Sequence, residues 1–199
     1  MFGEKPITLA DSTSYVSYQD PSIDWDRVIA REHERDPKLR ERVSAAVASK
    51  LMTRPDLTED AARRALEQES VIERVSGLAS DNPAMTLEEY LPKDGQRVTV
   101  FRLGVVQRTN LARIQDETAG GAERPPRPAE RFWRCFLDGI RAIDNWGGKK
   151  PATIERGDVS FVDPKWLAET FVGPLAKISD EVGLVIWVWN RFSESDAKK

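Results

Sequence analysis

Residues able to perform acid–base or nucleophilic chemistry are few in this sequence, and they lie far apart. The sole histidine, His33, lies in the charged stretch AREHERD, and the sole cysteine, Cys135, lies in the apolar stretch FWRCFLD. A catalytic histidine needs an oriented partner and a nucleophile or substrate beside it, so a solvated helix face explains His33 better. An apolar environment raises the pKa of a thiol and makes it unreactive. We therefore predict no catalytic residue and no enzyme activity.

Metal and phosphate sites are equally hard to find. One cysteine and one histidine are too few for a zinc site built from these residues, and no segment gathers several carboxylates among apolar residues. No glycine-rich phosphate loop of recognised spacing occurs. Lys149 and Lys150 in WGGKKPAT could contact a phosphate, but a turn with solubilising lysines explains them equally well. The prediction is no metal and no cofactor, with an enzyme using these lysines as the third hypothesis.

An arginine patch beside the proline-rich stretch ERPPRPAE is the best candidate for nucleic acid binding. Arginines interleaved with aromatic residues can contact the phosphate backbone and stack on bases. However, Glu123 and Glu130 dilute the charge, and the aromatic residues fit a core stripe better. Nucleic acid binding is therefore a rival hypothesis rather than the favoured one. The patch consists of Arg124, Arg127, Arg131 and Arg134, beside Phe132 and Trp133.

Composition is that of an ordinary globular protein. A chain of 199 residues, 40% of them apolar, can bury a core as one domain with or without a smaller appendage. The charged fraction is 32%, yet the formal net charge is only −3, so no global field favours nucleic acid or membrane. The N-terminus lacks the pattern of a secretory signal, and the most apolar run, 182–188, is shorter than the roughly 20 residues that a membrane span requires. These features predict a soluble intracellular protein.

The first half of the chain is predicted to form an extended arm, residues 1–23, followed by a charged helical region, residues 24–93. Ser22 or Asp24 can cap a first helix, and Asp36-Pro37 interrupts it before a second helix that runs to about residue 51. Thr58 can cap a third, alanine-rich helix, and the stretch TLEEY matches a capping box. The weak apolar stripes of these helices indicate shallow packing or a partner.

The remaining residues, 94–199, are expected to form an α+β core domain. The stretch QRVTVFRLG alternates as a strand, for which the segments around Ile154 and Phe161 are candidate partners. A broad apolar stripe predicts a helix from Pro128 to about Ile143, ended by two glycines. Asp163-Pro164 opens a further helical region, which Gly173-Pro174 is expected to kink. The predicted fold is mostly helical, with a small antiparallel sheet of two or three strands and an extended N-terminal arm.

The apolar run near the C-terminus allows two interpretations. As a strand, it would place Val185, Trp187 and Trp189 on one face. Seven apolar residues spaced alternately four and three apart favour a helix instead, in which they form one apolar stripe, the seam. Trp187 then lies away from the seam and needs a second contact in the fold or in a partner. The seven residues are Phe171, Leu175, Ile178, Val182, Val185, Trp189 and Phe192.

Three phrases of the sequence resemble the small morphogenesis proteins of tailed bacteriophages, in particular the tail assembly chaperone-like group. They are ITLADSTSYVSYQDPSIDWD, VTVFRLGVVQRTNLARIQDE and the final WNRFSESDAKK. In that group a short β segment precedes a helix, and a terminal helix leads into a phrase like the last one; here 98–103 and 190–198 take those places. The charged helical insert at about 36–80 departs from the group's pattern.

The resemblance implies a non-enzymatic virion assembly protein of the host cytoplasm. Its expected partners are other phage structural proteins, the tape-measure protein among them; the alternative is a structural component of the head or tail that stays in the virion. A homo-oligomer is compatible with either role, and no membrane contact is expected. The arm, the isolated strand and the unassigned tryptophan suggest surfaces completed by other chains. The predicted partner contacts are Tyr15, Tyr18, Val100, Phe101 and Trp187, each with ordinary core packing as its alternative.

Overall fold

A computed structural model describes residues 12–81, 86–121 and 125–196. Helices dominate, and two small antiparallel sheets accompany them, which confirms the predicted α+β class. The elements are β1 (Ser12–Tyr15), α1 (Trp25–Arg35), α2 (Leu39–Thr53), α3 (Glu59–Asp81), α4 (Thr86–Glu89), β2 (Val100–Gly104), α5 (Arg108–Thr118), α6 (Pro128–Gly139), β3 (Ile140–Asp144), β4 (Thr153–Arg156), β5 (Val159–Val162), α7 (Pro164–Thr170), the 3-10 turn η2 (Gly173–Leu175) and α8 (Ala176–Asp196).

Helix ends in the first half of the chain follow the predicted capping residues. The Asp24 side chain accepts a hydrogen bond from the Arg27 N–H at the start of α1. Thr58 Oγ1 accepts from the N–H of Ala61, 3.3 Å away, at the start of α3. These side chains satisfy backbone donors that have no partner within the helix, so local sequence alone fixes where these two helices begin.

The three-stranded sheet has the order β1-β2-β3, and both pairs of strands are antiparallel. Residues 12–15 of the predicted arm therefore form an edge strand, with Ser12 opposite Gly104 and Tyr15 opposite Phe101. The other residues of the arm up to 11 lie outside the described part of the chain.

Two predictions about the sheet are wrong. The helix expected to reach Ile143 ends at Gly139, and Ile140–Asp144 forms β3, which pairs with β2. The segments around Ile154 and Phe161 pair with each other as the separate hairpin β4–β5. The β-branched Ile140 and Ile143 satisfy a helical stripe and a strand equally well, so the long-range pairing with β2 decides between them.

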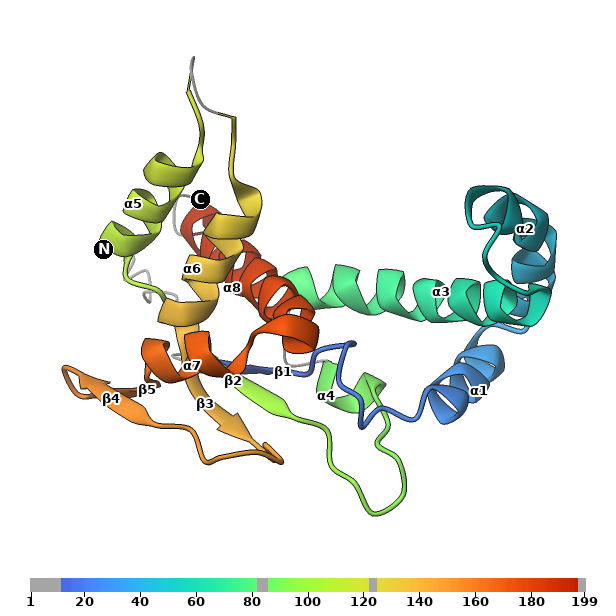
Figure 1. The fold of residues 1–199 in the computed structure, drawn as a ribbon, viewed down its shortest axis with the longest axis horizontal. Helices are drawn as coiled ribbons and strands as arrows, with labels where there is room; N and C mark the ends of the chain where they lie inside the picture. The colour runs from blue at the N-terminus through green and yellow to red at the C-terminus, as the bar shows by residue number, and fades with distance from the viewer. Residues whose placement is uncertain (1–11, 82–85, 122–124, 197–199) are drawn as a thin grey trace, which may run out of the picture.

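The main core lies between the sheet and the crossed helices α6 and α8 (Figure 1). The predicted C-terminal helix is confirmed as α8, and Val182, Ile186 and Trp189 are buried along it. The side chain of Phe192, the last residue of the predicted seam, is outside the described set. The rings of Phe101, Phe136, and Phe171 lie within 6.3 Å of one another, centroid to centroid. This aromatic cluster joins β2, α6 and the end of α7.

Two glycines allow α6 and α8 to pack in close contact. A Cβ atom added at Gly183 of α8 would overlap the carbonyl oxygen of Phe132 in α6. A Cβ at Gly139, the last residue of α6, would lie 2.8 Å from the Ile186 side chain. The two helices therefore meet backbone against backbone at Gly183. In most helix pairs, side chains at the contact keep the two axes about 8–10 Å apart.

The sheets and helices α5 to α8 form the body of the molecule. Helices α1, α2 and the first half of α3 form a helical lobe that lies away from this body (Figure 1). The long helix α3 spans the distance and packs against α8 with its C-terminal half. The lobe has a thin core of its own, made of Leu39, Val43, Val47 and Ala62 with three partly buried leucines around them. A second small cluster joins α1 and α3 to Tyr90 and Val100.

An arginine of α3 ties the lobe to the body. Arg74 donates to both carboxylate oxygens of Glu32 in α1, at 3.0 and 2.8 Å, and to Glu89 of α4 at 2.8 Å. Arg35 also donates to Glu89, at 2.7 Å. Burial would raise the pKa of Glu89, but the hydrogen bonds from the two guanidinium groups outweigh it and lower the pKa to about 2.

Replacing Gly183 by alanine tests the close helix crossing. Alanine is the better helix former by about 1 kcal/mol, so a gain in stability would be expected if space allowed. Because the new Cβ meets backbone that cannot rotate away, we expect Gly183→Ala to lower the free energy of unfolding by about 2 kcal/mol, measured by urea denaturation. Gly121→Ala, where a Cβ meets nothing within 4 Å, is the control and should change little. An equally stable Gly183→Ala variant would contradict the crossing.

The pH dependence of stability tests the joint between lobe and body, which is the set of ion pairs that Arg74 and Arg35 make with Glu89. Its pKa is lowered in the folded chain, so its contribution is present above pH 4.5 and is lost as the pH falls towards 2. Allowing for solvent screening at this joint, we expect Glu89→Gln to remove about 1–2 kcal/mol at pH 7 and much less at pH 2.5. Glu88→Gln, a change in the exposed neighbour, is the control. The same loss at both pH values would show that the carboxylate charge is not responsible.

Candidate functional site

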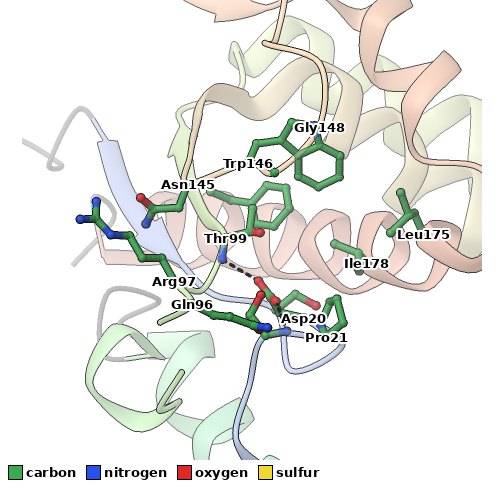
Figure 2. Close-up of a pocket in the computed structure, with 14 residues that line it drawn as sticks. Asp20, Pro21, Gln96, Arg97, Thr99, Asn145, Trp146, Gly148, Leu175 and Ile178 are labelled. Atoms are coloured by element: carbon green, nitrogen blue, oxygen red, sulfur yellow. Dashed lines mark hydrogen bonds between the residues drawn. The ribbon is translucent and has the colours of Figure 1, made fainter. Parts of the chain in front are cut away.

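A cleft of about 510 Å³ opens in the body where the sheet meets the start of α8. Figure 2 shows its walls, which come from the loop around Asp20, the segment 96–99 before β2, the turn 145–148 after β3, and the first turns of α8. Segments far apart in the sequence thus meet around one opening. Its volume falls within the range of small-ligand and peptide sites.

The cleft forms where the β2–β3 ladder ends. Beyond the pair Val100–Asp144, Asn145 adopts a left-handed conformation, φ 59°, and turns the chain away. Asparagine tolerates this region better than most residues. The Asn145 side-chain amide donates to the carbonyl of Val98 at 3.1 Å, which fixes the turn against the opposite strand.

Asp20 closes the base of the cleft. Its Oδ1 accepts from the N–H of Ser22 at 2.7 Å, and its Oδ2 accepts from the N–H of Thr99 at 2.6 Å (Figure 2). The side chain is almost fully buried. Because both oxygens already hold backbone donors, Asp20 positions the walls and is poorly placed to act as a general base.

Trp146 supplies the aromatic wall. Its ring centroid lies 5.2 Å from that of Phe171 and 6.2 Å from that of Trp166, so the indole rests on the core while its other side lines the cleft. A Cβ at Gly148 would lie 2.7 Å from Trp146 Nε1, so glycine there lets the indole lie against the turn. With Phe101 and Ile178 as the floor, the cleft is suited to hold an apolar side chain of a ligand.

A second, smaller cavity of about 200 Å³ lies between β1, α3 and α8. Glu181 of α8 borders it and is almost fully buried. Its carboxylate accepts hydrogen bonds from Tyr15 Oη at 2.6 Å, Ser17 Oγ at 2.7 Å and the Tyr18 N–H at 2.9 Å. Burial raises the pKa of Glu181 to about 7, although these hydrogen bonds act in the opposite direction.

Four of the five predicted partner residues lie inside the chain. Tyr15, Phe101 and Trp187 are 2, 1 and 5% exposed, and Val100 is 9% exposed. The alternative of core packing therefore describes them, and Tyr18 alone is partly exposed. The second contact that Trp187 requires comes from within the fold, because the Arg131 guanidinium of α6 lies 4.8 Å from its ring centroid.

The arginine patch is held by intramolecular contacts. Arg134 pairs with Glu117 and Glu130, and Arg127 pairs with Glu130 and donates to the carbonyl of Glu117. Arg131 donates to Thr118 Oγ1 at 2.9 Å and covers Trp187. Arg124 lies outside the described residues. The patch thus braces α5 against α6, which argues against a surface dedicated to phosphate groups.

The other candidate residues are also accounted for by packing or exposure. His33 Nε2 lies 2.9 Å from Glu67 Oε1, which links α1 to α3 within the helical lobe. Cys135 is fully buried, and burial raises the pKa of its thiol to about 12. Lys149 and Lys150 are exposed beside the cleft. Within 12–81, 86–121 and 125–196, no three His, Cys, Asp or Glu residues gather as metal ligands would.

Sequence reasoning missed the polar and aromatic residues that shape both cavities. Asp20 and Trp146 lie in loops, where no periodic pattern marks a buried side chain. Glu181 had a signal, because it follows Ile178 by three residues and precedes Val185 by four, which places it on the apolar side of α8. A lone carboxylate on such a face predicts hydrogen-bond donors from other segments of the chain, because buried polar groups are normally hydrogen-bonded.

Comparison of the chain with protein-family models, curated proteins and solved structures found no match. Among the helices that the structure describes, none is both long and apolar enough to cross a membrane. A functional proposal therefore depends on the geometry of the lobe and the cleft and on the phrases of the sequence.

The reactivity of Cys135 provides a direct test of the core. A buried thiol with a raised pKa is nearly all protonated at pH 8 and is inaccessible. We expect Ellman's reagent to modify the folded protein at least about 100-fold more slowly than the protein unfolded in guanidinium. Since the chain has one cysteine, the signal needs no separation of sites. Equal rates would place Cys135 at the surface and contradict the packing of α6.

Proposed function

We propose that this protein is a non-enzymatic assembly protein of a tailed bacteriophage, similar to tail assembly chaperones, and that it acts through protein–protein contacts. The observation that carries the proposal is the helical lobe, which extends away from the body on α3 (Figure 1). An extension of this kind enlarges the surface that can meet another chain.

The lobe is thin and presents most of its residues to the outside. Four buried side chains hold α2 against α3. Met52, in the last turn of α2, is 82% exposed, the largest exposure among the large apolar residues described. Methionine adapts to irregular partner surfaces because its side chain is flexible and polarisable. The end of α2 is therefore the part of the lobe that we assign to partner binding.

The cleft offers a second contact on the body. Two charged residues, Asp20 and Arg97, are among those that line it, and Asp20 is already engaged by backbone donors. What remains available is Arg97 at the rim and an apolar floor with the Trp146 indole beside it. Such a cleft favours the docking of an apolar side chain from an extended segment.

The phrases of the sequence lend further support. The phrase VTVFRL runs into β2, which is followed by α5, and residues 189–196 of the last phrase form the last turns of α8. This is the element order that the resemblance implies. The choice between a chaperone and a structural component of the particle depends on self-association.

Co-expression with the tape-measure protein of the same phage tests the proposal. We expect this protein to keep the tape-measure protein in the soluble fraction and to co-purify with it. Met52→Glu places a charge in the contact and should weaken the complex at least about tenfold, measured by calorimetry or interferometry. Val172→Glu, at a residue of the body that is 57% exposed, is the matched control and should leave affinity unchanged. A tape-measure protein that is equally soluble without this chain would overturn the chaperone role.

The mass in solution separates the chaperone from the structural alternative. Light scattering of the purified protein at low and high salt should give a monomer if the lobe and cleft are used by a different chain. A closed ring or a larger assembly would instead favour a structural component of the particle.

A further inference from the structure

A single buried carboxylate holds the N-terminal strand to the C-terminal helix. The hydrogen bonds that Glu181 accepts come from residues 15–19, the end of β1 and its direct continuation. Tyr15 and Tyr18 donate to one carboxylate oxygen, and Ser17 donates to the other. The chain segment that completes the edge of the sheet is thus fastened to α8 at one side chain.

These donors are neutral, and none supplies a positive charge. The titratable groups that face Glu181 are Tyr15 of β1, Tyr18 of the following loop and Tyr90 after α4. From α3 the cavity receives Ile72 and Ser76, which carry no charge. Asp20, in the same loop as Tyr18, adds a further carboxylate whose oxygens are occupied by backbone donors. Ionised Glu181 is therefore a buried negative charge without a cationic partner in the described residues, which is costly.

Besides the Glu181 contacts, β1 and its continuation are held by pairing with β2, by a hydrogen bond from the Arg102 guanidinium to Ser14 Oγ, and by the buried side chains of Tyr15 and Val16. β1 contains four residues and pairs with β2 alone. The N–H of Val16 also donates to Thr86 Oγ1 at 2.9 Å. Short edge strands have low local stability and open separately from the rest of a fold. A change in the strength of the Glu181 contacts will therefore show first as opening of this segment.

We propose that Glu181 is a proton-dependent latch: in its neutral form it holds residues 15–18 on α8 and β1 on the sheet, and loss of its proton favours release of the strand. Protonation keeps Glu181 and Ser17 in contact with the hydrogen bond reversed, because the carboxyl O–H can donate to Ser17 Oγ, and a hydroxyl accepts as well as donates. Release uncovers the outer edge of β2, Val100–Gly104, for pairing with another strand. This device extends the assembly role but does not depend on it.

The direction of the pH effect follows from the two states of Glu181. In the open state the carboxyl meets water and titrates near its ordinary value of 4.5, whereas in the closed state burial raises the pKa to about 7. Below pH 4.5 both states are protonated and the latch is at its strongest. Between these values the opening equilibrium rises nearly tenfold per pH unit, and above 7 it levels off. From pH 5.5 to 8.0 the expected increase is roughly 30-fold.

Hydrogen exchange of the full-length protein measures this opening. We expect the protection factors of the backbone amides in residues 13–18, corrected for intrinsic exchange, to fall roughly 30-fold from pH 5.5 to 8.0. In Glu181→Gln, which mimics the neutral carboxyl, they should stay high and be the same at both pH values. Asp180→Asn removes the exposed neighbouring carboxylate on α8 and should behave as wild type.

A second variant keeps the proposal testable if Glu181→Gln does not fold. Tyr15→Phe removes one donor to the carboxylate, which makes the ionised form less favourable and should move the midpoint of the pH response upward. Equal protection of wild type at pH 5.5 and 8.0 overturns the latch. So does a pH response that survives Glu181→Gln, or one that Asp180→Asn removes.

Discussion

The contact between the backbones of α6 and α8 at Gly183 is the constraint on which the rest of the body depends. Because this position has no side chain, α8 lies against the Phe132 carbonyl and its flanking residues reach into both neighbouring layers. Trp187 thereby comes under Arg131 of α6, and Ile186 fills the space beside Gly139. The position of α8 then decides where its few polar side chains can act.

Two buried polar residues of α8 use that position to hold the sheet at separate points. Glu181 fastens the continuation of β1, and Asn190, nine residues later, accepts from the N–H of Val106 at 2.9 Å, just after β2. Asn190 also donates to the carbonyl of Ile186 at 2.8 Å, so its amide is oriented by its own helix. Buried polar groups need such partners to be tolerated, and here the partners are the segments that flank neighbouring strands.

Local sequence was enough to predict several boundaries, since Asp24, Thr58 and Asp163 cap the helices that follow them as expected. The α+β class and the helical C-terminus were also predictable, because composition and a spacing of four and three depend on local periodicity. The secondary structure of Ile140 and Ile143 was not predictable. Their apolar pattern fits both helix and strand, and pairing with β2, some 40 residues earlier in the chain, decides for the strand. The cleft was likewise invisible, because it needs four segments to meet and its key aspartate is buried by their meeting.

Aromatic residues assigned to a partner from sequence are buried in the core, and this changes which surfaces the proposed contacts with another chain would use. With Tyr15, Phe101 and Trp187 buried, the chain retains the end of α2, the cleft beside Trp146 and the edges of its small sheets. The lobe and the cleft are available as they stand, whereas the outer edge of β2 is covered by β1. Since the Glu181 carboxylate fastens the continuation of β1 to α8, that edge is the one that the proposed latch exposes or withholds.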